Sequence, residues 1–232
     1  TLLGQAIEYH EAKVPYQDSG AMAEDSLDGV LTEKFAVVST VSTDAVGIYT
    51  VQYSVSDNAG NTAEATRTVH VMDTIPPVIT LLGQAGMVVE AGQPFVDPGV
   101  HAQDTLDGDA TDKVVATGSV DVMKPGVYEI VYSVRDYGGN KAVERVRKVV
   151  VQDTTGPVVE LLGQAAIPQE AGVEYIEPGY LARDIADGDV TSLVQVEGKV
   201  DVKKLGSYVL NYKAADAAGN LSDVVGRTVL VT

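Results

Sequence analysis

Acidic residues with short, repeated spacings are the part of this sequence best suited to chemistry. The motif Asp-x-x-Asp-Gly-Asp begins at Asp104 and at Asp184, and the motif Asp-x-x-Gly-Asn begins at Asp136 and at Asp216. Carboxylate and amide oxygens are hard ligands, and Ca²⁺ binds about six to eight of them. The motifs therefore predict calcium sites, provided that the fold brings them together.

The same string of residues recurs along the chain at a nearly constant interval. Leu-Leu-Gly-Gln-Ala occurs at Leu2, Leu81 and Leu161, with spacings of 79 and 80 residues. The chain is therefore three copies of one unit. We place them at residues 1–74 (copy one), 75–154 (copy two) and 155–232 (copy three). Because copy one begins inside its first strand, we expect the chain to be part of a longer array whose neighbouring domains are its partners.

Short apolar or alternating runs, separated by turn residues, indicate that each copy consists of strands. The expected strands of copy two are Val78–Leu82, Met87–Glu90, Phe95–Gln103, Lys113–Val120, Val127–Arg135 and Ala142–Val151. Six or seven strands in a copy of this length, with no helical period, predict a small antiparallel sandwich.

One tyrosine-containing run in each copy indicates which residues face the core. In copy two, alternation places Tyr128, Ile130, Tyr132 and Val134 on one face. Tyr128 follows a turn glycine, as in the tyrosine corner of immunoglobulin-like sandwiches, where the hydroxyl bonds back to the backbone. Tyr132 stands where antibody domains place a cysteine, and Tyr53 and Tyr212 are its counterparts in copies one and three.

These strands also predict where the carboxylates meet. Asp104 and Asp136 each follow a row of core-facing residues. If the two strands belong to opposite sheets and end at the same pole, their carboxylates converge. The last strand of the preceding copy ends at this pole too, so the linker residues Asp73 and Asp153 would arrive beside them.

The predicted calcium ligands thus gather at the two joints between copies. They are Asp73, Asp104, Asp107, Asp109, Asp136 and Asn140 at the first joint, and Asp153, Asp184, Asp187, Asp189, Asp216 and Asn220 at the second. Copy one departs from the pattern, because Val30 stands where Asp109 and Asp189 stand in the others. A second interpretation stays open: Asp-Gly and Gly-Asn are turn formers, and an aspartate at a strand end bonds loop amides in an Asx turn.

The order of the motifs resembles a known family. Pro-Pro-Val-Ile-Thr-Leu-Leu-Gly, Glu-Ala-Gly, Asp-Pro-Gly, Asp-x-x-Asp-Gly-Asp, Gly-x-Tyr and Asp-x-x-Gly-Asn follow one another from Pro76 to Asn140. This pattern resembles the bacterial immunoglobulin-like repeat of surface proteins; similar repeats occur in pesticidal crystal proteins, and the hyalin repeat shares the closing motif. The resemblance implies an all-β chain of three tandem immunoglobulin-like antiparallel β-sandwiches arranged as an elongated rod.

The resemblance also implies a role. The family is one of non-catalytic extracellular modules, so we expect a structural spacer or stalk in a larger secreted or cell-surface bacterial protein. Calcium at the joints would make such a stalk more rigid. The alternative is an adhesion module that binds a glycan or a protein partner, although the absence of tryptophan and the scattered exposed tyrosines argue against a stacking platform.

Composition excludes several other classes of function. Thirty-three acidic residues against sixteen basic ones give a net charge of −17, which repels nucleic acid. The absence of cysteine excludes disulfides and thiol chemistry, and no apolar run approaches the about 18 residues of a membrane span. No catalytic motif is present, and threefold repetition argues against one unique active centre. We therefore expect a monomer that is not an enzyme and does not insert into membranes.

Overall fold

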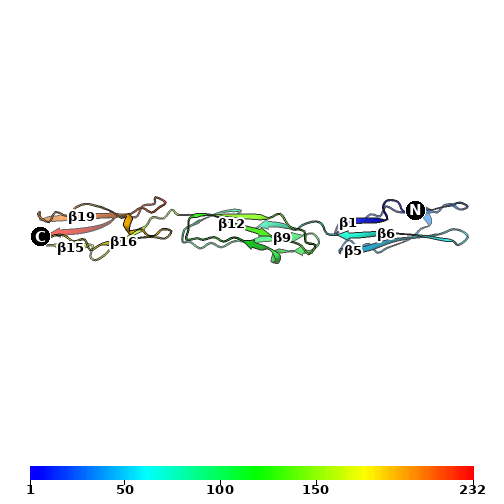
Figure 1. Ribbon diagram of the computed structural model, residues 1–232, viewed down its shortest axis with the longest axis horizontal. Coiled ribbons are helices and arrows are strands. Elements are labelled where there is room, and N and C mark those ends of the chain that lie inside the picture. The colour runs from blue at the N-terminus through cyan, green and yellow to red at the C-terminus, as the bar shows by residue number, and fades with distance from the viewer. The chain divides into compact units, whose positions relative to one another are not determined.

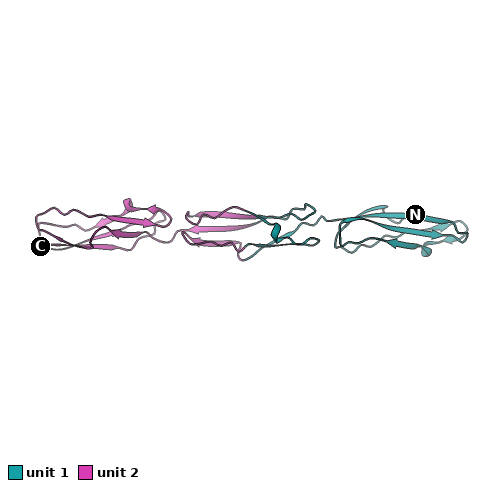
Figure 2. Ribbon diagram, turned by 90° about the horizontal axis from the view of Figure 1, so that it is seen from below, with its two compact units in different colours: residues 1–82, 99–116, 132–145 teal, residues 83–98, 117–131, 146–232 magenta.

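The computed structural model describes residues 1–232 and consists of β-strands with three single turns of 3₁₀ helix. The chain divides into two compact units, residues 1–82, 99–116 and 132–145, and residues 83–98, 117–131 and 146–232 (Figure 2). Copy two contributes strands to both units, so the boundaries of the three copies stay a prediction. No helix in the structure is long and apolar enough to cross a lipid bilayer.

Copy one contains one four-stranded sheet and a short hairpin. Its elements are β1 (Ile7–Glu11), β2 (Glu24–Asp25), β3 (Gly29–Val30), η1 (Thr32–Lys34), β4 (Ala36–Ser39), β5 (Gly47–Ser56) and β6 (Thr62–Met72). The sheet has the order β1-β6-β5-β4, and β2 pairs with β3. An isolated bridge joins Leu2 to Ala21.

Copy two contributes one three-stranded and one four-stranded sheet. Its elements are β7 (Val78–Leu81), β8 (Gly86–Glu90), β9 (Val100–Asp104), β10 (Gly108–Asp109), η2 (Thr111–Lys113), β11 (Val115–Thr117), β12 (Gly126–Ser133) and β13 (Arg145–Gln152). The sheet orders are β10-β9-β7 and β11-β12-β13-β8. As expected, the strand that ends at Asp104 and the tyrosine strand belong to different sheets.

Copy three repeats this arrangement within the second unit. Its elements are β14 (Val158–Leu161), β15 (Ala166–Gln169), β16 (Tyr180–Asp184), β17 (Gly188–Asp189), η3 (Thr191–Leu193), β18 (Gln195–Glu197), β19 (Gly206–Lys213) and β20 (Val225–Val231). The sheets are β14-β16-β17 and β15-β20-β19-β18. Figure 1 labels β15, β16 and β19 of this copy. Residues from both sheets, including Val159, Ala182 and Tyr212, form one buried core.

One strand pair in each copy runs parallel, whereas the other pairs of copies one and three are antiparallel. β1 runs parallel to β6, β8 to β13 and β15 to β20. In copy three the cause is local: Gly163, with φ of 78°, lies between β14 and β15 and lets the chain pass from the small sheet to the large one. The chain then continues alongside the last strand of the same copy.

Two of the expected strands of copy two are much shorter than predicted, and the run Ala142–Val151 begins three residues late, at Arg145. The run Phe95–Gln103 was wrong in its first half, because the strand there is Val100–Asp104. Pro98 has no N–H to donate, and Gly99 adopts φ of 80°, so the strand cannot begin earlier. The run Lys113–Val120 shortens to Val115–Thr117, since Lys113 ends a 3₁₀ turn and Gly118, with φ of 103°, follows the strand.

The tyrosine predictions are confirmed. Tyr53, Tyr132 and Tyr212 are buried in the three cores. The hydroxyl of Tyr128 donates to the carbonyl oxygen of Lys124 at 2.8 Å, and Tyr49 and Tyr208 make the same contact four residues upstream. Each tyrosine corner thus ties the start of a core strand to the turn before it.

An arginine in each copy is the feature of the core that the sequence patterns did not predict. Arg67 on β6, Arg147 on β13 and Arg227 on β20 are 0% exposed and face inward in rows that otherwise contain valine. Arg227 donates through Nη2 to the carbonyl oxygens of Leu162 and Gly179, at 2.8 and 3.0 Å. The signal was present in the sequence: the three arginines are 80 residues apart.

Each buried arginine lies beside a carboxylate of its own copy. Arg67 pairs with Asp18, Arg147 Nε lies 2.8 Å from Asp97 Oδ1, and Arg227 Nη1 lies 3.2 Å from Glu177 Oε1. A buried guanidinium is costly unless it is paired, and these carboxylates pair all three, although Nε and Nη1 of Arg227 have no hydrogen-bond partner.

Tyrosine hydroxyls complete the network in copy three. Tyr212 and Tyr175 donate to Glu177 Oε2 at 2.6 and 2.7 Å. Burial raises the pKa of Glu177, but the bonds from Tyr212 and Tyr175, together with the Gly179 amide and the charge of Arg227, outweigh it and hold that pKa below its usual value. Burial and the bond to Glu177 raise the pKa of Tyr175 to about 12, so its hydroxyl remains a donor at neutral pH.

We expect Arg227→Met to destabilise copy three. The change keeps an apolar stem but leaves Glu177 and two carbonyl oxygens without their partner, at a cost of about 2 to 3 kcal/mol. Urea denaturation followed by tyrosine fluorescence measures this loss. Arg183→Met, at an exposed position on β16, is the control and should change stability by about 0.5 kcal/mol or less. Equal losses in the two variants would contradict a special role for the buried charge.

Candidate metal centre

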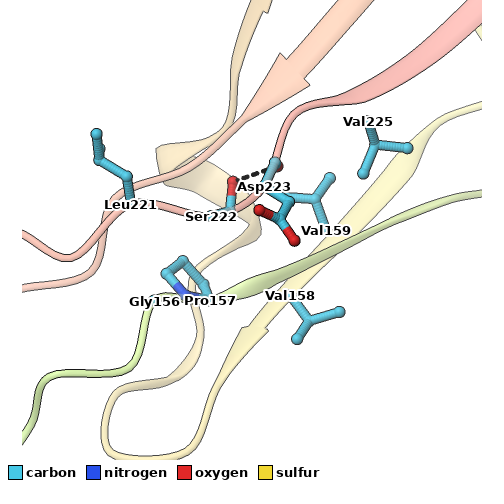
Figure 3. Close-up of a pocket in the computed structure, with 8 residues that line it drawn as sticks. All are labelled: Gly156, Pro157, Val158, Val159, Leu221, Ser222, Asp223 and Val225. Carbon is cyan, nitrogen blue, oxygen red and sulfur yellow. Dashed lines mark hydrogen bonds between the residues drawn. The ribbon is translucent and has the colours of Figure 1, made fainter.

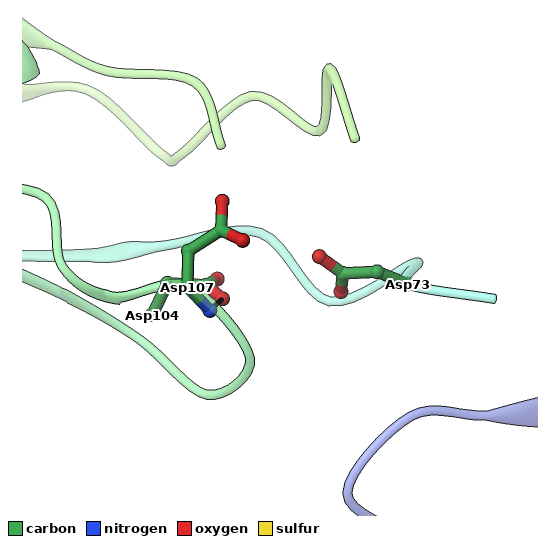
Figure 4. Close-up of side chains that lie close together, drawn as sticks. All are labelled: Asp73, Asp104 and Asp107. Carbon is green, nitrogen blue, oxygen red and sulfur yellow. Dashed lines mark hydrogen bonds between the residues drawn. The ribbon is translucent and has the colours of Figure 1, made fainter. Parts of the chain in front are cut away.

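The first joint brings three carboxylates together. Oxygen atoms of Asp73, Asp104 and Asp107 all lie within 4.8 Å of one another. Figure 4 shows Asp73, on the linker that follows β6, facing the loop that carries Asp104 and Asp107. Residues about 30 positions apart in sequence therefore form one cluster.

Local hydrogen bonds determine how Asp104 is oriented. Its Oδ1 accepts the backbone N–H groups of Leu106 and Asp107, at 2.8 and 2.9 Å. This is the Asx turn of the second interpretation. The turn uses only Oδ1, however, and Oδ2 is left to face the cluster. Turn formation and metal binding are thus compatible in the same side chain.

Two further predicted residues connect this loop to the linker. Asp136 accepts the Asn140 backbone N–H at 2.7 Å and its side-chain amide at 2.8 Å. The same amide group donates to the Asp73 carbonyl oxygen at 3.0 Å. Asn140 therefore presents N–H groups rather than its carbonyl oxygen to Asp73 and Asp136, and these bonds hold the linker against the loop.

Two oxygen atoms of the first cluster are buried with no hydrogen-bond partner. They are Oδ2 of Asp73 and Oδ2 of Asp104, and Asp104 is only 3% exposed. Burial raises the pKa of Asp73, and the negative charges of Asp104 and Asp136 raise it further, against the Ile75 amide that lowers it. Unsatisfied buried carboxylate oxygens are expensive, and a hard cation would supply what they lack.

The second joint repeats the arrangement. Asp153, Asp184 and Asp216 have oxygen atoms within 4.8 Å of one another. Asp184 Oδ1 accepts the amides of Ala186 and Asp187, and Asn220 donates to the Asp153 carbonyl oxygen at 3.1 Å. Burial raises the pKa of Asp153, and the charges of Asp184, Asp216 and Asp187 raise it further. Four carboxylates thus influence one another at this joint, as at the first.

Four of the predicted carboxylates lie outside these clusters, namely Asp109, Asp136, Asp187 and Asp189. Asp109 and Asp189 accept the backbone N–H groups of Thr111 and Thr191, each at 2.9 Å, at the start of the 3₁₀ turns. The bonds from the threonine side chain and amide hold the pKa of each carboxylate below its usual value. Neither is among the carboxylates that the structure gathers within 4.8 Å.

Copy one has the same loop geometry without a gathered cluster. Asp25 Oδ1 accepts the amides of Leu27 and Asp28, and Asp57 accepts the Asn61 amide at 2.8 Å. These bonds match those of Asp104 and Asp136. The metal-type groupings occur only at the two joints, where a linker aspartate is added.

Glutamates that the sequence analysis did not include in the joints also hold the linkers. Glu11 accepts the Thr74 amide at 3.0 Å, and Glu90 accepts the Thr154 amide at 2.6 Å. The Thr154 amide holds the pKa of Glu90 below its usual value. The recurring Glu-Ala pair at Glu11, Glu90 and Glu170 was the available signal.

The molecule also has shallow hollows, of which one lies beside β14. It has a volume of about 370 Å³ and is lined by Gly156, Pro157, Val158, Val159, Leu221, Ser222, Asp223 and Val225 (Figure 3). The Ser222 hydroxyl donates to the Asp223 carbonyl oxygen at 2.9 Å, and it accepts the Ala214 amide. This hydroxyl is therefore already bonded within the chain, and Asp223 is the one acidic side chain in a mainly apolar lining.

Comparison with known proteins identifies the family. The profile described as "Bacterial surface protein, Ig-like domain" matches residues 1–71, 79–151 and 159–231. The chain belongs to this family. The bacterial surface Ig-like resemblance is thereby confirmed, together with the three tandem repeats.

Curated relatives of this Ig-like chain come from distant sources. It is 32% identical over 227 residues to the pesticidal crystal protein Cry22Aa of Bacillus thuringiensis, covering 90% of this chain and 29% of that protein. It is 30% identical over 193 residues to hyalin of Lytechinus variegatus, covering 80% and 36%. The chain thus spans about a third of the length of these relatives. Among solved structures, a protocadherin gammaB7 EC3-6 cis-dimer matches with a TM-score of 0.36 and 13% identity, covering 100% of this chain and 73% of that one.

The raised pKa of Asp73 predicts how pH acts on the metal-free chain. A carboxyl whose pKa is raised by folding contributes stability that is fully present below its unfolded value, near 3.8, and is lost as pH rises through the folded value. Asp73→Asn should therefore increase the thermal midpoint at pH 7 in chelator, with the gain vanishing as the pH falls below 4.

Asp109→Asn is the matched control with the opposite sign. The pKa of Asp109 is lowered by folding, so its charged form contributes stability at pH 7 that is lost as the pH falls through the folded value. This variant should have a lower midpoint than the parent at neutral pH. A loss of stability in metal-free Asp73→Asn at pH 7 would contradict the argument from unsatisfied charge.

Proposed function

We propose that this chain is a non-catalytic spacer or stalk of tandem Ig-like modules in a larger secreted or cell-surface bacterial protein, and that Ca²⁺ at the two joints makes it more rigid. Membership of a bacterial surface family supports the location. Repetition supports the spacer role, because the length of an array increases with the number of copies. As part of such an array, the chain acts as a monomer.

The observation that carries the calcium proposal is the pair of buried, unpartnered oxygens at the first joint. Asp73 comes from the linker and Asp104 from a loop of the next copy, and both leave Oδ2 without a partner. A cation bound between them would link the two segments directly. Asp107 and Asp136 would add carboxylate oxygens, and the corresponding ligands at the second joint are Asp153, Asp184, Asp187 and Asp216.

The size and chemistry of the site favour calcium over other metals. All of the candidate ligand atoms are oxygens, whereas zinc prefers nitrogen and sulfur donors. A site made of several carboxylates suits Ca²⁺, whereas Mg²⁺ requires a stricter octahedral geometry and retains more of its water. We expect Asn140 and Asn220 to orient the loops.

Calcium should therefore increase the thermal midpoint of the intact chain. A ligand that binds only the folded state adds about 2.7 kcal/mol when its concentration is 100 times its dissociation constant. Differential scanning calorimetry in excess Ca²⁺ and in chelator measures the shift. In Asp73→Asn combined with Asp153→Asn the shift should disappear, and in Asp109→Asn combined with Asp189→Asn it should persist. An identical shift in both double variants would show that calcium acts elsewhere.

A second candidate function, adhesion to a glycan or protein, is favoured by one surface of copy one. Tyr9 on β1 and Ile48 on β5 are each 69% exposed and lie in one row with His70 of β6. The rings of Tyr9 and His70 are 5.1 Å apart. An exposed aromatic pair flanked by an aliphatic side chain can stack on a sugar or a partner protein. Val88 and Val127 hold the places of Tyr9 and Ile48 in copy two.

Adhesion would make binding depend on copy one. On a glycan array, the intact chain should bind above background, and Tyr9→Thr combined with Ile48→Thr should abolish that signal. Val88→Thr combined with Val127→Thr is the matched control and should bind like the parent. If the parent chain gives no signal on the array, the chain does not bind those glycans, and the spacer role is the better explanation of its function.

A further inference from the structure

We propose that the ammonium group of Lys113 acts as a counter-ion to the carboxylates of the first joint and weakens calcium binding there. The second joint therefore binds calcium at lower calcium concentrations than the first. The inference rests on the calcium sites of the proposed function, and it concerns how those two sites differ. It follows from one lysine and one tyrosine that copy two has and copy three lacks.

At the first joint, Lys113 contacts both the carboxylate cluster and an aromatic ring. Its Nζ lies 3.9 Å from Asp107 Oδ2 and 3.1 Å from the centroid of the Tyr137 ring. Asp107 Oδ2 also accepts the Tyr137 backbone N–H at 2.7 Å. The Asp107 side chain is only 11% exposed, so the ammonium lies beside a carboxylate that water reaches poorly.

Two segments of copy two bring Lys113 and Tyr137 together. Lys113 ends the 3₁₀ turn η2, and Tyr137 follows Asp136 in the loop after β12. The ring holds the ammonium through a cation–π contact, and Asp107 attracts it from the other side. Lys113 is thus held near the cluster and is not free in solvent.

At the second joint both residues are different. Leu193 stands in place of Lys113, and Ala217 in place of Tyr137. No lysine, arginine or histidine nitrogen lies within 4.0 Å of Asp153, Asp184, Asp187 or Asp216. Lys124 lines the hollow beside Asp153 and Asp187, but it too lies beyond that distance. The four carboxylates of this joint therefore have no resident cation close enough to pair with.

The difference has opposite consequences with and without metal. A calcium ion at the first joint meets a fixed positive charge and must compete with it for Asp107, which lowers affinity. Without calcium, the same ammonium offsets part of the repulsion among the carboxylates of the first joint. At the second joint no ammonium lies within 4.0 Å of the carboxylates to do the same.

Calcium titration of the intact chain in two single-joint backgrounds tests this. Asp153→Asn removes a ligand of the second joint, so the titration measures the first joint. Asp73→Asn removes a ligand of the first joint, so the titration measures the second. By isothermal titration calorimetry we expect the first joint to bind calcium about tenfold more weakly, as one nearby like charge in a partly solvated site would produce. Lys113→Leu, which introduces the residue of copy three, should remove most of that difference in the Asp153→Asn background and change nothing in the Asp73→Asn background.

The reciprocal variant and the metal-free chain complete the test. Leu193→Lys combined with Ala217→Tyr should weaken the second joint about tenfold, by the same electrostatic reasoning. In chelator, Lys113→Leu should lower the thermal midpoint, because it removes the counter-ion. Both measurements use substitutions at exposed or half-buried positions. Circular dichroism can verify that each variant is folded.

The outcomes separate this inference from the proposed function. If neither background binds calcium, the calcium sites are wrong, and the chelator midpoint of Lys113→Leu alone then decides the counter-ion role. If both joints bind with equal affinity and Lys113→Leu has no effect, the calcium sites stand and the inference is overturned.

Discussion

A guanidinium buried between the sheets is the interaction on which each copy depends. In copy three, Arg227 on the last strand donates to Leu162 and Gly179, the residues just after β14 and just before β16, and lies beside Glu177. One side chain thereby connects the last strand to the ends of β14 and β16 in the three-stranded opposite sheet. In a sandwich of this size without disulfides, such a connection adds to a limited apolar core. Because β16 begins at Tyr180 and ends at Asp184, the same arginine anchors the strand that positions a joint carboxylate.

The chain treats buried acidic groups in two different ways. Inside copies one and three, a carboxylate pairs with an arginine and accepts a tyrosine hydroxyl, as Glu177 does with Arg227 and Tyr212. At the joints, carboxylates are gathered without such a partner, and Asp73 and Asp104 retain buried oxygens that nothing satisfies. Each core therefore pairs its charges within the chain, whereas the joints are where an external cation could act. The acidic residues behind the net charge of −17 therefore include some that are neutralised inside the copies and some that are not, at the joints. The carboxylates that are not neutralised are the ones to which an added cation could bind.

Much of this architecture could be predicted from the sequence because repetition and alternation are local signals. The inward row of Tyr128, Ile130 and Tyr132 follows directly from a period of two residues, and the tyrosine corner follows from a glycine two residues before Tyr128. The convergence of Asp73 on Asp104 could be inferred from strand order alone. The buried arginines were missed because charged residues are expected on the surface, and only their contacts with carbonyl oxygens across the sandwich explain their position.

The sequence by itself determined that the chain is three copies of one β-sandwich unit, which residues face each core, and which acidic motifs lie at strand ends. These properties depend on residues close together in the chain. Only the tertiary structure decided which oxygen of each aspartate is consumed by a turn and which is left unpartnered, that Asn140 holds the linker through its N–H groups, and that Lys113 lies against Asp107. Those choices depend on distances and orientations between segments remote in sequence, and no spacing of residue types encodes them.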